Sequence, residues 1–160
     1  MELGLDKKVA LVTGGNRGTG QIIAQRLAEE GAIVMVHSLV QGESTLIASE
    51  LPNALAVWGD ITTDQGAQQL AEQCLAHHPV EILINNYGTA EPGNWMDISS
   101  EGWLDLYQKN TLSVARMVRL LVPPMIQLQT GRIINLGTIG STRPNARMPH
   151  YYAAKVHWQL

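Results

Sequence analysis

The feature that most constrains this fold is a glycine-rich turn near the start of the chain, Thr13-Gly14-Gly15-Asn16-Arg17-Gly18-Thr19-Gly20. The apolar run Val9–Val12 leads into the turn, and an amphipathic pattern that includes Ile23 and Leu27 follows it. This order predicts a strand, a tight turn and a helix, with glycines that let helix and backbone approach closely. A helix starting near Gly18 would direct free backbone N–H groups into the turn, so an anionic ligand is expected there.

Taken alone, that turn also fits an ordinary loop, because its G-x-x-x-G-x-G spacing differs from the G-x-G-x-x-G dinucleotide fingerprint. The rest of the chain, however, alternates short apolar runs with helical patterns. Such alternation predicts the α/β class, with a parallel, doubly wound sheet and right-handed crossovers. Further strands are expected at 32–36, 54–58, 81–84 and 132–136, and helices at 43–51, 64–77, from 99 or 100 to a kink or stop at Pro123-Pro124, and from about His150.

Length and composition narrow the classes of protein. At 160 residues the chain is expected to form one domain, residues 1–160, and its net charge of −3 favours neither nucleic acid nor an anionic membrane as a partner. No apolar run approaches the roughly 18 residues of a membrane span, and the first residues lack the apolar core of a signal peptide. The single cysteine, Cys74, falls on an apolar helical stripe and is expected in the core. These features predict a cytoplasmic protein.

The polar and glycine-containing segments follow the predicted strands. In parallel, doubly wound sheets the ligand crevice lies outside the carboxyl ends of the strands. The sequence therefore predicts a ligand crevice formed by residues 14–20, 37–38, 60–61, 85–88 and 137–138.

Two residues near the C-terminus, Tyr151 and Lys155, are four positions apart and would share one face of a helix. An ammonium beside a phenol favours the phenolate, which makes Tyr151 a candidate general acid for a carbonyl that becomes an alcohol. Tyr152 has Val156 at the same offset and is not equivalent. The alternative is an ordinary helical pair without a chemical role.

Together, these motifs resemble the short-chain dehydrogenase/reductase family, and most closely its 3-oxoacyl-acyl-carrier-protein reductase branch. The resemblance runs from Val9 to Lys155 with every motif in order. The positions that match the family's glycine turn, adenine contact, N-N-A-G motif and catalytic tetrad are Thr13 to Gly20, Asp60-Ile61, Asn85-Asn86-Tyr87-Gly88, and Asn110, Thr138, Tyr151 and Lys155.

The resemblance implies a Rossmann-type sheet of five strands in the order 3-2-1-4-5, with the family's last two strands missing and the chain ending inside the helix that carries Tyr151. It also implies reversible hydride transfer between a nicotinamide and a carbonyl. Tyr151 would protonate the carbonyl oxygen of a small-molecule substrate while Thr138 hydrogen-bonds it. Lys155 would assist the tyrosine and hold the nicotinamide ribose, and Asn110 would support a water on the proton path.

The expected cofactor is NADP(H) rather than NAD(H). An NAD site in this fold requires a carboxylate at the end of the second strand, where this chain has His37-Ser38 and no acidic residue before Glu43. Arg17 in the glycine turn can pair with a 2′-phosphate. The residues expected to bind the cofactor are Gly14, Asn16, Arg17, Gly18, Thr19, Gly20, His37, Ser38, Asp60, Ile61, Asn86, Gly88, Tyr151 and Lys155.

Three departures from the family bear on function. Thr138 adds a methyl group where the family has serine, and Tyr87 replaces a small residue beside the adenosine, where its ring would crowd the site. The chain also stops at Trp158-Gln159-Leu160, whereas the family continues over nicotinamide and substrate. The first interpretation is an NADP-dependent reductase of a 3-oxoacyl compound or related ketone. The alternative is a truncated, catalytically incompetent dinucleotide-binding or interaction module.

A homo-oligomer, either a dimer or a tetramer, is also expected, because the family packs its long fourth helix and its tyrosine-bearing helix against a second subunit. The strand 133–136 would add an unpaired edge, and the alternative is a marginal monomer whose edge the last helix shields. No metal is expected: His77 and His78 read as solvated, and the other histidines show no ligand spacing. The apolar residues expected at the interface are Leu104, Leu112, Ala115, Val118, Leu121, Val122, Trp158 and Leu160.

Overall fold

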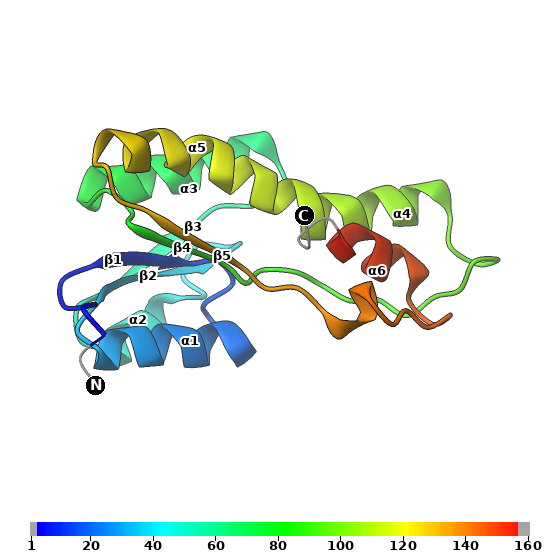
Figure 1. The fold of residues 1–160 in the computed structure, drawn as a ribbon, viewed down its shortest axis with the longest axis horizontal. Helices are drawn as coiled ribbons and strands as arrows, with labels where there is room; N and C mark the ends of the chain where they lie inside the picture. The colour runs from blue at the N-terminus through cyan, green and yellow to red at the C-terminus, as the bar shows by residue number, and fades with distance from the viewer. Residues whose placement is uncertain (1–2, 157–160) are drawn as a thin grey trace.

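The computed structural model describes residues 3–156, and its centre is a five-stranded parallel sheet (Figure 1). The strands lie in the order β3-β2-β1-β4-β5, which confirms the expected doubly wound sheet. In chain order the elements are β1 (Val9–Val12), α1 (Gly18–Glu29), β2 (Ile33–Ser38), α2 (Thr45–Glu50), β3 (Ala54–Trp58), α3 (Asp64–His77), β4 (Ile82–Asn85), α4 (Ser100–Tyr107), the π-helical turn η1 (Gln108–Leu112), α5 (Ser113–Gln127), β5 (Arg132–Asn135), the 3-10 turn η2 (Ile139–Ser141) and α6 (Pro149–Lys155).

Helices cover both faces of the sheet, with α1 and α2 on one side and α3 and α5 on the other (Figure 1). Alternate residues of a strand therefore enter different cores: Leu11 of β1 packs towards α3 and α5, and Val12 packs towards α1 and α2. Burial on both faces explains why the central strands read as unbroken apolar runs. Cys74 is fully buried in the core beneath α3, as predicted.

Two helices begin where hydroxyl side chains cap them. The Thr63 hydroxyl accepts a hydrogen bond from Gly66 N at 3.1 Å, and the Ser99 hydroxyl accepts one from Gly102 N at 3.2 Å. Each hydroxyl satisfies one of the backbone N–H groups that a helix leaves unpaired in its first turn. The predicted starts of α3 and α4 are therefore confirmed.

Strand β2 extends two residues beyond its predicted end at residue 36. His37 pairs with Val57 and Ser38 with Trp58, so both polar residues belong to the strand. Both are buried, and their side chains bond to neighbouring backbone atoms rather than to solvent. The expected end at residue 36 is wrong because tertiary hydrogen bonds satisfy both polar side chains within the sheet.

The long helical region does not stop at Pro123 and Pro124. It consists of α4, η1 and α5, and it continues through both prolines to Gln127. Leu128 N donates to Pro124 O at 3.1 Å, so helical bonding resumes directly after the prolines. Leu121 and Met125 are buried against the sheet, and this packing outweighs the lost backbone hydrogen bonds. In the part of the chain described, no helix is both long and apolar enough to cross a membrane.

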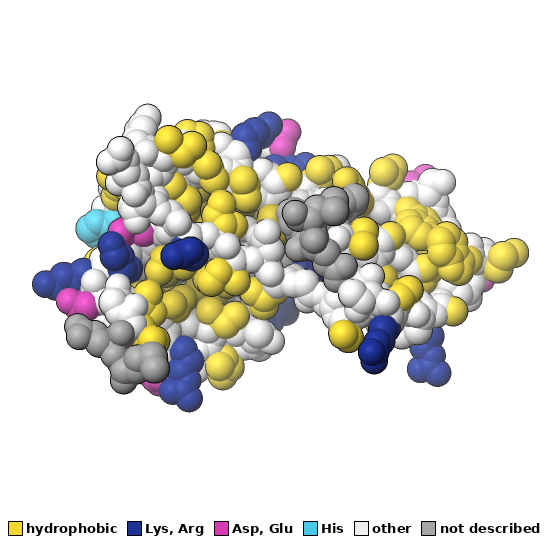
Figure 2. Space-filling model, in the orientation of Figure 1, with side chains coloured by type: hydrophobic (Ala, Val, Ile, Leu, Met, Phe, Trp, Pro, Cys, Tyr) yellow, Lys and Arg dark blue, Asp and Glu magenta, His cyan; other side chains and the backbone are white. Residues whose placement is uncertain are grey.

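Strand β5 forms one edge of the sheet. All four of its residues are exposed, and within residues 3–156 it pairs only with β4. Figure 2 shows hydrophobic side chains gathered over α5 and this edge. The expected interface residue Leu121 is instead fully buried, whereas Leu104 is 64% exposed. His157, Trp158 and Leu160 lie outside the described residues.

Candidate active site

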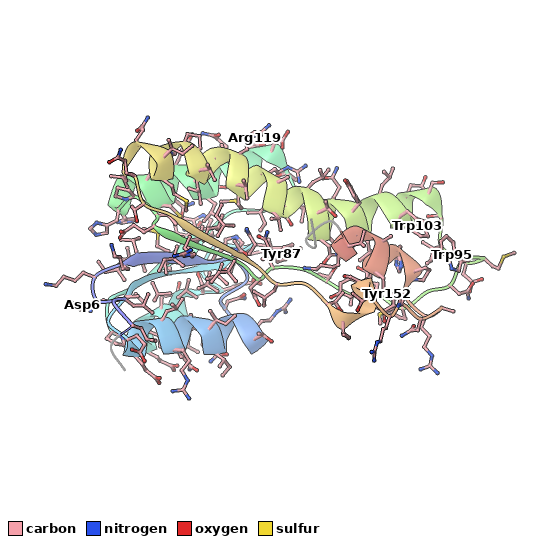
Figure 3. The ribbon with its side chains drawn as sticks, viewed as in Figure 1. Asp6, Tyr87, Trp95, Trp103, Arg119 and Tyr152 are labelled. Carbon is pink, nitrogen blue, oxygen red and sulfur yellow. The ribbon has the colours of Figure 1, made fainter. Side chains whose placement is uncertain are left out.

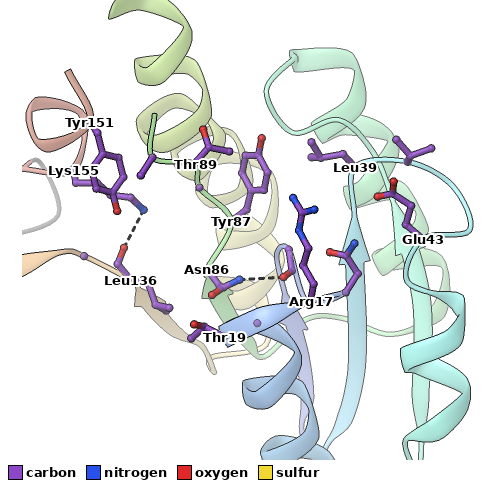
Figure 4. Close-up of a pocket in the computed structure, with 17 residues that line it drawn as sticks. Arg17, Thr19, Leu39, Glu43, Asn86, Tyr87, Thr89, Leu136, Tyr151 and Lys155 are labelled. Carbon is purple, nitrogen blue, oxygen red and sulfur yellow. Dashed lines mark hydrogen bonds between the residues drawn. The ribbon is translucent and has the colours of Figure 1, made fainter. Parts of the chain in front are cut away.

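A cavity of about 540 Å³ lies at the carboxyl ends of the strands (Figure 4). Its walls come from the glycine turn, the loop after β2, the segment after β4, the end of β5 and one face of α6. The predicted crevice is therefore present, although the 37–38 and 60–61 segments do not line it. The lining residues are Gly14, Asn16, Arg17, Thr19, Gly20, Leu39, Val40, Glu43, Asn86, Tyr87, Gly88, Thr89, Ala90, Leu136, Gly137, Tyr151 and Lys155.

The glycine turn is held tightly against β4 and α1. The Asn86 amide nitrogen donates to Thr13 O at 2.9 Å and to Gly14 O at 3.1 Å. Gly14 has a φ of 62°, a conformation that favours glycine, and a Cβ at Gly20 would overlap Gly14 O. Gly14 is therefore required by its backbone conformation, and Gly20 by the close approach of helix α1 to the turn.

The structure corrects the expected roles of His37 and Ser38. The His37 ring is fully buried beneath the turn, where its Nδ1 accepts from Gly14 N at 3.0 Å and its Nε2 lies 2.9 Å from Gly59 O. Burial lowers the pKa of His37 to about 4, opposed by the bond to Gly59 and by Asp60. Ser38 is buried as well, and its hydroxyl donates to Val40 O. Neither side chain faces the cavity.

Three other expected cofactor residues also lie outside the cavity lining. Ile61 is 2% exposed and belongs to the core beneath α3. Asp60 is exposed, and its carboxylate accepts hydrogen bonds from the backbone and hydroxyl of Thr62. Gly18 begins α1 with a φ of 54°. Of these three, only Ile61 is excluded from ligand contact by burial.

The cavity's end near β2 carries charges of both signs. The Arg17 side chain is exposed and forms no ion pair with any other residue in the range 3–156. Glu43 also lines this end, with Leu39 and Val40 beside it. The sequence did not single out these three because they lie in the loop after β2, and only the folded path of that loop brings them to the cavity.

Tyr87 lines the middle of the cavity, so the expected crowding by its ring has a structural basis. Figure 3 shows Tyr87 at the carboxyl ends of the strands, and in Figure 4 its ring and the Arg17 side chain border the same part of the cavity. Burial and the nearby Asp60 carboxylate raise the pKa of Tyr87, so the ring is neutral at ordinary pH.

Tyr151 and Lys155 enter the opposite end of the cavity from the same face of α6, as their spacing predicted. Lys155 is 4% exposed, and its Nζ donates to Leu136 O at 3.1 Å. Burial lowers the pKa of Lys155. A Cβ at Gly88 would crowd both Lys155 Nζ and Asn110 Oδ1, so the absence of a side chain at Gly88 lets the three groups meet.

Asn110 lies in the π-helical turn η1 and is fully buried. Its Oδ1 accepts from Thr89 N at 3.1 Å, and its Nδ2 donates to Thr89 O at 2.9 Å and to Leu106 O at 3.0 Å. The side chain therefore holds the segment after β4 in place as a wall of the cavity. The local widening of a helix into a π turn is common at functional sites.

Thr138 is half-buried and does not line the cavity. Its hydroxyl accepts a hydrogen bond from Gly140 N at 3.3 Å and so caps η2. A threonine hydroxyl that accepts one hydrogen bond still carries a proton to donate. The Thr138 hydroxyl thus keeps a donor, although the side chain lies outside the cavity lining.

Comparison with known proteins places the chain in a family of dehydrogenases. A family model described as short chain dehydrogenase matches residues 8–159. An uncharacterized oxidoreductase of Bacillus subtilis, YvaG, is 34% identical over 97% of this chain, and the 3-oxoacyl-acyl-carrier-protein reductase FabG of Vibrio harveyi is 32% identical over 96%. The crystal structure of L-sorbose reductase from Gluconobacter frateurii, complexed with NADPH and L-sorbose, superimposes with a TM-score of 0.94 at 28% identity, over 98% of this chain.

The chain is shorter than each of these proteins. It spans 60% of the Bacillus subtilis oxidoreductase, 64% of the Vibrio harveyi reductase and 62% of the sorbose reductase.

Proposed function

Because the chain belongs to the short chain dehydrogenase family, we propose that it takes part in the NADP(H)-dependent reduction of a carbonyl compound to an alcohol. The observation that carries the proposal is one cavity lined by the glycine turn at one end and by Tyr151 and Lys155 at the other. The similarity to a reductase of 3-oxoacyl groups and to a sorbose reductase with bound NADPH supports it. The proposed substrate is a 3-oxoacyl compound or a related ketone.

The residues around the cavity fit a phosphorylated dinucleotide. The N-cap residue Arg17 does not cap α1 with its side chain, and the first turn of α1 has no acidic residue, so backbone N–H groups near Gly18, Thr19 and Gly20 can receive a pyrophosphate. Arg17 has no competing carboxylate partner in the described part of the chain and would pair with the 2′-phosphate. Lys155 would hold the nicotinamide ribose. When bound, the nicotinamide supplies or accepts the hydride.

Tyr151 would deliver the proton that the reduction needs. Addition of hydride to a carbonyl carbon places negative charge on the oxygen, and a hydroxyl already aimed at that oxygen stabilises the charge. The Tyr151 hydroxyl would donate its proton there, and the Thr138 hydroxyl would donate a second hydrogen bond. Thr138 can do so because its link to Gly140 uses only its acceptor capacity.

Lys155 would assist in two ways. An ammonium has three N–H donors, and one of them is taken by Leu136 O. The remaining two can serve a ribose hydroxyl, while the positive charge favours proton release from Tyr151. Asn110 contributes by holding Thr89, and its expected support of a water on the proton path stays a prediction.

We also propose that copies of the chain associate, because apolar side chains are exposed on the α5 and β5 side of the molecule. Ile126 is 70% exposed, and Ile133 and Ile134 of β5 are 38% and 46% exposed. A cytoplasmic location remains the expectation from composition.

The function is tested by following NADPH oxidation with 3-oxoacyl thioesters and simple ketones, comparing Tyr151→Phe with Tyr152→Phe. We expect Tyr151→Phe to lower the rate by a factor of about 10²–10⁴, as loss of a general acid does. Tyr152 is a matched control because its buried hydroxyl accepts from Asn145 Nδ2 rather than lining the cavity.

Full activity in Tyr151→Phe would contradict the assignment of the general acid. Binding of NADPH by the wild-type chain without turnover of any carbonyl compound would contradict the reductase proposal and favour a dinucleotide-binding module.

A further inference from the structure

The glycine turn rests on a histidine that has no contact with the cavity. His37 is fully buried, and it meets the turn through its ring and through its own backbone. Its Nδ1 accepts from Gly14 N at 3.0 Å, and its carbonyl oxygen accepts from Gly15 N at 2.9 Å. Two successive N–H groups of the turn are therefore bound to one residue of β2.

Asn86 binds the carbonyl groups of the two peptide bonds that flank Gly14. Its Nδ2 donates to Thr13 O and to Gly14 O, at 2.9 Å and 3.1 Å. Each peptide bond that flanks Gly14 is thus fixed at both ends, with its N–H on His37 and its carbonyl on Asn86. Glycine has little rotational preference of its own, so these four hydrogen bonds decide how the turn faces the cavity.

The two partners of the His37 ring require one tautomer. A backbone N–H can only donate, so Nδ1 must carry a lone pair towards Gly14. The carbonyl of Gly59 can only accept, so the ring proton must be on Nε2, 2.9 Å away. A doubly protonated ring would point an N–H at the Gly14 N–H. The low pKa of His37, about 4 because of burial, agrees with a ring that stays neutral.

We propose that His37 is a positioning residue for dinucleotide binding: its unprotonated Nδ1 orients the Gly14 peptide, and through it the wall of the cavity. This inference rests on the proposed function, because it assigns the turn to the cofactor. Loss of the Nδ1 acceptor would leave the partly buried Gly14 N–H without this partner and free the peptide to rotate. Loss of the Nε2 donor would leave the Gly14 peptide in place.

Two substitutions separate these ends of the ring. His37→Asn places an amide oxygen close to the position of Nδ1, so Gly14 keeps its acceptor and Gly59 loses its donor. His37→Gln can place its amide nitrogen near the position of Nε2, so Gly59 keeps its donor and Gly14 loses its acceptor. Each variant removes one hydrogen bond of the buried His37 ring, and each is expected to lower the melting temperature.

The readouts are the Kd of NADPH and the exchange rate of the Gly14 amide hydrogen by NMR. We expect His37→Asn to keep the Kd within about threefold of wild type and His37→Gln to raise it at least about tenfold, with a matching rise in Gly14 exchange. Equal losses of affinity in the two variants, or unchanged Gly14 exchange in His37→Gln, would overturn the positioning role.

Two further measurements keep the test decisive. Nitrogen-15 shifts of the wild-type ring are expected to show a proton on Nε2 and none on Nδ1, and the reverse tautomer would refute the proposal. If His37→Gln does not fold, a folded His37→Asn that loses more than about tenfold in NADPH affinity refutes it as well. Failure of the wild-type chain to bind NADPH would contradict the proposed function, and Gly14 exchange would still decide the role of His37.

Discussion

Lys155 donates a hydrogen bond from Nζ to the carbonyl oxygen of Leu136 across 3.1 Å, and so ties a buried cation of α6 to the residue that follows β5. This contact aims the ammonium at the cavity from a fixed position. Burial of the ammonium removes part of its hydration, and this lowers the pKa of Lys155.

Replacement of that cation should affect cofactor binding and chemistry together. For Lys155→Met we expect the Kd of NADPH to rise about tenfold and turnover to fall by about 10² or more, since one ammonium serves both steps. Isothermal titration and steady-state rates measure the two effects. Lys7→Met, an exposed lysine before β1, controls for charge alone. A loss confined to turnover, with unchanged NADPH binding, would contradict the ribose contact.

Arg17 should determine the preference for a phosphorylated cofactor. Arg17→Ala is expected to raise the Kd of NADPH about tenfold while leaving that of NADH nearly unchanged, because only NADPH carries the 2′-phosphate. Glu43→Gln is the opposite change: it removes a carboxylate that lines the same end of the cavity, and NADPH should bind more tightly. Titrations at equal salt test both variants. Tighter binding of NADH than of NADPH by the wild-type chain would refute the preference.

The Tyr87 ring should limit the affinity for either dinucleotide. Because the ring lines the cavity where the resemblance puts a small residue, Tyr87→Ala is expected to lower the Kd of NADPH and NADH alike. Tyr107→Ala, a tyrosine that does not line the cavity, serves as the control. Weaker binding in Tyr87→Ala would show instead that the ring contacts the cofactor favourably.

The buried His37 ring should make the fold sensitive to mild acid. Its pKa is about 4 in the folded protein against 6.5 in an unfolded chain, so the unfolded state binds the proton first as the pH falls. The contribution is therefore complete above about pH 6.5 and is lost as the pH falls towards 4, costing about 2 kcal/mol between about pH 7.5 and pH 5. Urea unfolding of wild type and His37→Asn measures it, since the variant lacks the titrating ring. A difference between the two proteins that does not change with pH would contradict the shift.

The exposed apolar edge should make the chain self-associate. We expect sedimentation at micromolar concentration to show species larger than a monomer, and Ile134→Lys on β5 to shift them towards the monomer by placing a charge on the strand's edge. Leu46→Lys on α2 is the control, because it places a charge on another exposed apolar side chain, 67% exposed against 46% for Ile134. A sharp single wild-type species near 17.5 kDa would end the oligomer proposal.

Much of the fold was predictable because its strands are local, uninterrupted patterns. Val9–Val12 and Ala54–Trp58 have their predicted bounds, since apolar runs flanked by turn residues leave few alternatives. The end of β2 was missed because His37 and Ser38 are polar by type but satisfied by tertiary hydrogen bonds. Likewise, nothing near Pro123 in the sequence shows that packing on the sheet would carry α5 past it.

The candidate site divides in the same way. Residues that act through local geometry, such as the glycine turn and the Tyr151–Lys155 pair, were found by their spacing. Glu43 was missed because it lies in the loop after β2, and only the folded path of that loop brings it to the cavity. The sequence predicts that His37 contacts the cofactor, whereas its buried ring accepts a hydrogen bond from Gly14 in the turn. Only the direction of the side chain distinguishes these two roles.

The order of the strands also determines how strongly each end of the cavity is protected against local unfolding. The glycine turn at one end of the cavity follows β1. This strand lies between two other strands and has three residues with no exposed surface. At the other end of the cavity, Leu136 and Gly137 follow β5, the outermost strand, whose four residues are all exposed. Segments with few buried contacts open at lower free energy than the centre of a sheet. Local opening at Leu136 and β5 is therefore expected at a lower free energy than opening of the glycine turn.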